Sequence, residues 1–250
     1  NSSMDEVRIW QGVRTDSLIR ANMCKRLSGS ESGLFRYFRM DEASGTTITD
    51  SGPFGVNGTL VNSVTGNRIF SGASIGTNST VYFHSSWTGI SHSISTTKGD
   101  FQVDSVIGAN QYLHLYSYNN IPLNASGLAF LDTTPQVFGM FLTDGSFNSR
   151  GRVRYLYGAY PRAVSLETAL NSYSRDNGQN AWTPNTFSKD TLNNRFTKFD
   201  TLSVEFVPGN FTGTCTLPDS LRTVSVGFNS AQITWNPNGV SSWNIDFSSA

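Results

Sequence analysis

Hydrophobic and polar side chains alternate with a period of two along much of this chain. The alternation is clearest from Leu34 to Met40, where successive side chains point to opposite faces of a predicted strand. Turn-forming residues break the run at 41–45, and β-branched residues resume it at 46–49. Six further strands are predicted at 80–84, 101–107, 112–118, 137–142, 152–157 and 202–207. Short strands at this spacing, separated by Asn, Asp, Gly and Pro turns, predict an antiparallel β-sandwich.

One short helix is predicted near the N-terminus, over residues 16–27. Thr15 is suited to cap it, because a threonine hydroxyl accepts a hydrogen bond from a free backbone N–H of the first turn. The apolar residues at helical spacing are expected to bury one face, and they are Leu18, Ile19, Met23 and Leu27. The predicted fold class is therefore all-β, with jelly-roll-like sandwich modules in tandem and one short helix.

Two later segments are less clearly patterned. Residues 163–174 fit the spacing of a helical face and also that of a strand. Residues 184–198 are polar and fit a hairpin or a loop.

Composition narrows the classes of protein that fit this pattern. Charged residues make up 14% of the chain, below the typical share of about 25%, and the formal net charge is +0. The neutral charge therefore predicts no nucleic acid partner. The chain contains no run of about 18 apolar residues, so no membrane span is predicted. Cys24 and Cys215 are too few for a disulfide framework. With abundant Ser, Thr and Asn, these features favour an extracellular or cell-surface bacterial protein.

Three segments resemble modules of large secreted bacterial proteins. The motifs at 5–10 (DEVRIW), 21–23 (ANM) and 33–60 resemble the closing part of a LamG-type, concanavalin A-like jelly-roll. The opening at 71–76 (SGASIG), Tyr155-x-Tyr157, the Arg-Asp-Asn at 175–177 and Trp182 resemble a β segment that follows such modules, which favours a strand at 163–174. Residues 217–247, with Trp235, resemble the start of a fibronectin type III domain.

The resemblance implies a division into three parts. Residues 1–61 would be the C-terminal part of a LamG-like module, 62–210 a β-sandwich module and 211–250 an incomplete fibronectin type III domain. Because a full domain of the last kind needs roughly 100 residues, the chain is expected to belong to a longer multidomain protein. In similar proteins these modules accompany type IX export and cell-surface attachment.

The residues that carry enzyme chemistry occur in unfavourable patterns. The adjacent acids of Asp5-Glu6 and Asp41-Glu42 would point to opposite faces of a strand, whereas glycoside hydrolysis needs two carboxylates that flank one bond. The three histidines, His84, His92 and His114, lack a close metal-ligand spacing, and no Gly-x-Ser-x-Gly motif occurs. The sequence therefore predicts a non-catalytic protein without a cofactor.

Calcium is the one metal that the loops suggest. Jelly-roll modules often bind calcium through loop oxygens, and oxygen donors around predicted turns are supplied by Asp41, Glu42, Asp50 and Asn57. The alternative is that these side chains fix the turns by hydrogen bonds to the backbone.

Tyrosines at alternate positions suggest a ligand-binding face. Tyr112, Tyr116 and Tyr118 share one face of a predicted strand, and Tyr155 and Tyr157 share a face of another. Such a row would offer rings for stacking against sugars, but aromatic side chains also fill ordinary cores.

These observations predict a non-catalytic adhesion or binding segment of a larger bacterial surface protein. Its expected partners are cell-surface or matrix glycans, or other modules of the same polypeptide. Two alternatives remain: a purely structural stalk or spacer, and an accessory module of a secreted hydrolase whose catalytic domain lies outside this chain.

Overall fold

The computed structural model describes residues 4–62, 68–107, 111–128, 134–143, 150–185, 187–201, 204–210, 219–226 and 231–236. The chain forms two compact units, Asn1–Asn210 and Phe211–Ala250. The first unit contains all the sites discussed below. In the second, β16 (Asp219–Val226) and β17 (Ala231–Asn236) pair as an antiparallel hairpin, within the segment that resembles the start of a fibronectin type III domain. The remainder of the segment that resembles a fibronectin type III domain, from residue 237 on, lies outside the described residues.

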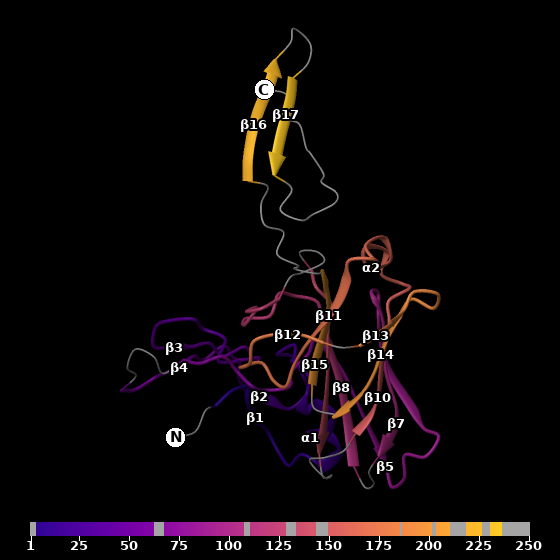
Figure 1. Cartoon of the computed structure of the whole chain (residues 1–250). Coiled ribbons are helices and arrows are strands. Elements are labelled where there is room, and N and C mark those ends of the chain that lie inside the picture. The colour runs from indigo at the N-terminus through magenta and orange to yellow at the C-terminus, as the bar shows by residue number, and fades with distance from the viewer. Residues whose placement is uncertain are drawn as a thin grey trace. The chain divides into compact units, whose positions relative to one another are not determined.

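The first unit is built on two antiparallel sheets (Figure 1). The five-stranded sheet has the order β13-β14-β10-β7-β6, with β6 (Ser91–Thr96), β7 (Gly99–Ile107), β10 (Arg150–Leu156), β13 (Ser188–Asp190) and β14 (Arg195–Thr201). The six-stranded sheet has the order β12-β11-β15-β9-β8-β5, with β5 (Asn78–His84), β8 (Gln111–Tyr118), β9 (Val137–Thr143), β11 (Leu170–Arg175), β12 (Thr183–Pro184) and β15 (Val204–Asn210).

The sheets pack face to face through one hydrophobic core. Leu113 and Leu115 of the six-stranded sheet, and Phe101 and Val153 of the five-stranded sheet, are buried together in it. The ring of Phe101 stacks on that of Phe138 across the core, with centroids 5.2 Å apart. The predicted all-β antiparallel sandwich is therefore confirmed. Among the described residues, no helix combines the length and the apolar character needed to cross a membrane.

The N-terminal segment, defined here as residues 4–62, adds a helix and two small antiparallel sheets. In the first, β1 (Val7–Trp10) pairs with β2 (Leu34–Phe38), and in the second, β3 (Thr47–Ile48) pairs with β4 (Gly58–Thr59). The helix is α1 (Asp16–Met23), which begins after its predicted cap, because the Thr15 hydroxyl accepts a hydrogen bond from the Leu18 N–H at 3.4 Å.

The predicted burial of one face of this helix is wrong. No residue of α1 is buried, and Leu18, Ile19 and Met23 are 44%, 54% and 40% exposed. The helix contacts β5 and β8 instead through a charged side chain, since Arg20 lies over the Tyr112 ring at 4.0 Å. Leu27 is buried, as expected, but it lies beyond the helix.

Backbone hydrogen bonds join the N-terminal segment to the sandwich. The Arg26 N–H donates to the Gly76 carbonyl at 2.8 Å, and the Gly76 N–H donates to the Cys24 carbonyl at 2.9 Å. A Cβ atom at residue 76 would lie 2.8 Å from the backbone of Ser117, so glycine permits this close approach to β8. The segment therefore packs on the face of the six-stranded sheet that points away from the core.

The less clearly patterned segments contain more structure than the sequence suggested. Residues 163–174 include the end of α2 (Pro161–Ser165) and most of β11, so both expectations hold in part. Residues 184–198 include β13 and the start of β14, which form the expected hairpin. The strand β6 was not predicted, because its sequence SHSIST carries a single aliphatic residue.

Candidate functional site

The outer face of the six-stranded sheet carries a buried polar network. Because side chains alternate along β8, Leu113 and Leu115 enter the core, whereas Tyr116 points outward. Gly139 of β9 lies between Tyr116 and Glu205 in the strand register. A Cβ atom at Gly139 would lie 2.0 Å from Cζ of Tyr116. The absence of a side chain there lets the tyrosine hydroxyl donate to Glu205 Oε1 at 3.1 Å.

Glu205 is the centre of this network. Arg175 of β11 donates to Glu205 Oε2 through Nε at 2.6 Å and Nη2 at 2.5 Å, and the two side chains are only 4% and 5% exposed. The Arg175 guanidinium also donates to the Asn124 carbonyl at 2.9 Å and lies over the Trp182 ring at 4.3 Å. Each charge is therefore matched and hydrogen-bonded, as burial requires.

The two tyrosines beside Glu205 stay protonated. Burial raises the pKa of Tyr116 and of Tyr118, and the Glu205 carboxylate raises both further because it repels a second negative charge. Both phenols can then act as hydrogen-bond donors toward Glu205. The carboxylate is occupied by an arginine and by these donors, which fits a structural role and leaves it a poor nucleophile or base.

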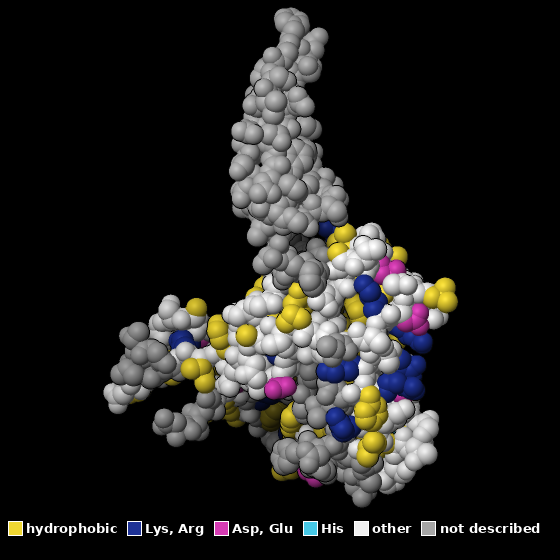
Figure 2. All heavy atoms as spheres, viewed as in Figure 1, with side chains coloured by type: hydrophobic (Ala, Val, Ile, Leu, Met, Phe, Trp, Pro, Cys, Tyr) yellow, Lys and Arg dark blue, Asp and Glu magenta, His cyan; other side chains and the backbone are white. Residues whose placement is uncertain are grey.

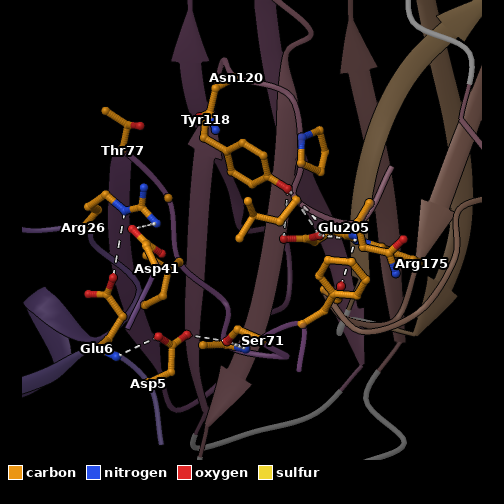
Figure 3. A pocket seen from close by; sticks show the side chains of 18 residues that line it. Asp5, Glu6, Arg26, Asp41, Ser71, Thr77, Tyr118, Asn120, Arg175 and Glu205 are labelled. Atoms are coloured by element: carbon orange, nitrogen blue, oxygen red, sulfur yellow. Dashed lines mark hydrogen bonds and ion pairs between the residues drawn. The ribbon is translucent and has the colours of Figure 1, made fainter. Parts of the chain in front are cut away.

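A polar pocket of about 110 Å³ lies between this network and the N-terminal segment (Figure 3). One wall carries Tyr118, Arg175 and Glu205, and Figure 3 shows Asp5, Glu6, Arg26 and Asp41 on the other side. Asp5 is linked to the sandwich side by a hydrogen bond from the Ser71 hydroxyl. The pocket thus joins residues that lie up to two hundred positions apart in the sequence.

The two walls differ in how firmly their charges are held. Arg26 and Asp41 are 40% and 43% exposed and lie 3.5 Å apart, and Arg26 also lies 3.9 Å from Glu6. Such exposed pairs are weak, so a ligand can replace one partner at little cost. The Arg175–Glu205 pair is buried and fixed. Arg26 and Asp41 are therefore the charged groups best placed to bind a ligand.

The predicted calcium residues are not gathered at one site. Asp50 is buried, and its carboxylate accepts backbone hydrogen bonds from Tyr37, Gly52 and Val56 at 3.0, 2.8 and 3.0 Å. Burial alone would raise the pKa of Asp50, but these hydrogen bonds outweigh burial and lower it.

The side chains of Asn57 and Glu42 also fix turns. Asn57 Oδ1 accepts from the Asp50 N–H at 3.0 Å, and Glu42 Oε1 accepts from the Thr49 N–H at 2.7 Å. Asp41 points instead toward the pocket. Within the described part of the chain, no three Asp, Glu, His or Cys side chains are grouped to hold a metal ion.

The predicted tyrosine face is divided between the core and the pocket. Tyr155 and Tyr157 are fully buried, and they donate hydrogen bonds to the Lys98 carbonyl at 2.5 Å and to Glu167 at 2.6 Å. Both belong to the core between the sheets, as Val153 does, because all three share one parity of β10 and its continuation. They therefore present no ring to a ligand.

The first tyrosine row shares one face, as predicted, and this face points away from the core, but most of the row is covered. Tyr116 is buried in the Glu205 network, and Tyr112 is half-buried beneath Arg20. Tyr118 is the member of the row that lines the pocket. The structure thus joins one predicted ligand residue, Tyr118, with one predicted metal residue, Asp41.

Sequence reasoning missed several residues of the pocket. The acidic pair at residues 5–6 was considered only for hydrolysis, and Arg175 was noted only within its Arg-Asp-Asn triplet. Arg26 carries no motif, so no local signal marks it. Sequence spacing also missed a histidine pair, since Nε2 of His84 and Nε2 of His92 lie 2.7 Å apart.

No protein-family model, curated protein or solved structure matches the chain. The resemblance to LamG-type and fibronectin type III modules therefore stays a prediction.

Proposed function

We propose that this chain is a non-catalytic, extracellular binding segment of a larger bacterial surface protein, and that it binds a glycan in the pocket beside Tyr118. The observation that carries this proposal is the exchangeable Arg26–Asp41 pair, which faces that pocket. Sugar hydroxyls donate and accept hydrogen bonds, and an arginine next to a carboxylate offers both functions. The pocket is large enough for one end of a sugar ring, at about 110 Å³.

The chemistry of the pocket favours binding over catalysis. Of its carboxylates, Glu205 is held by Arg175 and two tyrosines, while Glu6 accepts hydrogen bonds from Tyr37 and Arg8. Hydrolysis of a glycosidic bond needs one carboxyl group free to give up a proton and one free to attack or to activate water. The described hydrogen bonds already use these two groups and both oxygens of Asp5, so Asp41 alone remains exchangeable, which supports a role in recognition.

The test is binding of the full chain to a glycan array, with and without calcium. Asp41→Asn and Arg26→Gln each remove one charge from the exchangeable pair, and each is expected to weaken binding about tenfold or more, the range for a lost charged hydrogen bond. Asp190→Asn is the matched control, because Asp190 pairs with Arg195 at 2.9 Å at a similar exposure on the other sheet.

Two results would overturn the proposal. Unchanged glycan binding by both pocket variants would move the site elsewhere. Absence of binding to any glycan, from protein with a cooperative unfolding transition, would remove the binding role.

A structural spacer is the second candidate function, and one observation favours it. The N-terminal segment and the sandwich are joined by backbone hydrogen bonds through Gly76 and form one compact unit, as expected for docked modules that transmit force. If the folded chain binds no glycan, the spacer role becomes the preferred function.

A further inference from the structure

A row of arginines crosses the outer face of the five-stranded sheet. Arg150, Arg152 and Arg154 alternate along β10 with Gly151, Val153 and Tyr155, which are buried. Their side chains therefore share the face that points away from the core, at intervals of about 6.6 Å along the strand. The strand lies between β14 and β7, so the row crosses the middle of the sheet.

One buried carboxylate holds two of these arginines. Asp104 of β7 is opposite Arg152 in the register, and its side chain is 7% exposed. Its Oδ1 accepts from Arg152 Nε at 2.7 Å, and its Oδ2 accepts from Arg154 Nη2. Arg152 is bound to this carboxylate through Nε, and its side chain is still 46% exposed.

The row keeps a net positive charge. The Arg150 side chain is exposed and makes no hydrogen bond or ion pair with any described residue, so Asp104 is the only carboxylate bound to the three guanidinium groups among the described residues. The guanidinium groups of Arg152 and Arg154 are pre-oriented by that carboxylate. Pre-orientation reduces the entropy that is lost when such groups bind an anion.

The described neighbours of the arginine row on this face are mostly polar. Neighbours on the same face include Ser93 of β6, Gln102 of β7 and Thr197 of β14, and Phe199 lies opposite Arg152 with 46% of its surface exposed. The N-terminal segment covers the other sheet, and Figure 2 shows Lys and Arg side chains gathered over the region where Figure 1 places β10 and β14.

We propose that this face binds an acidic polysaccharide, a polymer of sugars that carries carboxylate or sulfate groups. Arginine forms paired hydrogen bonds with such groups, and the neighbouring serine, glutamine and threonine side chains suit sugar hydroxyls. The exposed Phe199 ring offers an apolar surface for a sugar ring. A row of arginines spread along a strand suits an extended chain better than a small anion.

The mixture of charges favours this polymer over a nucleic acid. Asp100 and Asp104 lie on the same face as the arginines, and the whole chain is neutral. A closely spaced phosphate backbone is repelled by such carboxylates. Sugar hydroxyls can instead donate hydrogen bonds to them. The proposal concerns a surface separate from the pocket and does not depend on it.

The test is calorimetric titration of the full chain with polygalacturonate and heparin, with neutral dextran and single-stranded DNA as comparisons. Arg150→Gln and the double variant R150Q/R152Q are expected to weaken binding to the acidic polymers about tenfold or more. Arg14→Gln is the control, because it removes the same charge from the N-terminal segment, where Arg14 lies over Trp10 at 3.9 Å. Arg14→Gln is expected to change affinity less than about twofold.

Each outcome decides the proposal. Equal weakening by Arg14→Gln would show that net charge alone drives binding. Tighter binding of DNA than of either polysaccharide would show that this face prefers a nucleic acid, which would overturn the proposal. No binding by the folded wild-type chain would also overturn it. Arg150→Gln alone keeps the test valid if the double variant fails to fold, since the Arg150 side chain has no hydrogen-bond or ion-pair partner among the described residues. Asp41→Asn is expected to leave this binding unchanged, which separates it from the pocket.

Discussion

Replacing Glu205 by glutamine is the sharpest test of the buried network. Glu205→Gln preserves the size and most of the shape of the side chain but removes its charge. Arg175 would then remain buried, with a 4% exposed side chain, beside a neutral amide. A glutamine amide presents one oxygen, whereas the carboxylate accepts from Arg175, Tyr116 and Tyr118 through two.

The size of the effect follows from the burial of the pair. Removal of one partner from a buried ion pair destabilises a protein by about 3–5 kcal/mol, because the other charge stays desolvated and uncompensated. For a unit of this size each kcal/mol lowers the melting temperature by about 2–4 °C, so a decrease of roughly 6–20 °C is expected.

Urea unfolding followed by tryptophan fluorescence measures this change, since the Trp182 ring lies under Arg175. Glu167→Gln is the matched control, because Glu167 accepts one hydrogen bond from Tyr157 and has no described ion pair. We expect that control to cost about 1 kcal/mol. The double variant R175M/E205L removes both charges and is expected to be more stable than Glu205→Gln. A loss below about 1 kcal/mol for Glu205→Gln would refute this account of the network.

Three further predictions concern packing, pH and thiol chemistry. Gly139→Ala is expected to destabilise the sandwich by about 1–3 kcal/mol in urea unfolding, because the new methyl group would overlap the Tyr116 ring. Gly158→Ala is the control and is expected to be nearly neutral, because a Cβ atom there would meet its nearest atom at 3.7 Å. Equal destabilisation by the two substitutions would contradict this prediction. Burial and the neighbouring His84 lower the pKa of His92 below 6.5, so the unfolded state binds the proton more readily than the folded state. The free energy of unfolding is therefore expected to decrease as the pH falls from 7 to 5, and to decrease less in His92→Gln. The same pH dependence in the variant and the wild-type chain would refute this prediction. Burial raises the pKa of the Cys24 thiol to about 12, so the thiol is expected to be alkylated at pH 8 only after the chain unfolds. Mass spectrometry of the peptide that contains Cys24 measures the labelling. Rapid labelling of the folded chain would contradict the burial of this thiol.

The two cysteines of the chain differ in what the structure shows of them. Cys24 is a free, buried thiol in the structure, whereas Cys215 lies outside the described residues. No spacing rule in the sequence decides whether two cysteines so far apart are paired.

The local elements of this protein could be predicted from its amino-acid sequence. Period-two alternation located six strands of the sandwich, and the hydroxyl of Thr15 correctly marked the start of α1. These features were predictable because they depend on contacts between residues only a few positions apart. For the same reason Asp50 and Asn57 were correctly considered as turn-fixing side chains.

Which face of each element is buried, and which distant residues meet, depends on the packing of the whole unit. Leu18 and Ile19 have helical spacing but stay exposed, since the sandwich accepts α1 through Arg20 instead. Tyr157 and Tyr118 each lie two positions after another tyrosine in a predicted strand, yet Tyr157 fills the core and Tyr118 lines the pocket. Strand order and sheet packing set these outcomes through pairings across the whole first unit, which a local pattern does not encode.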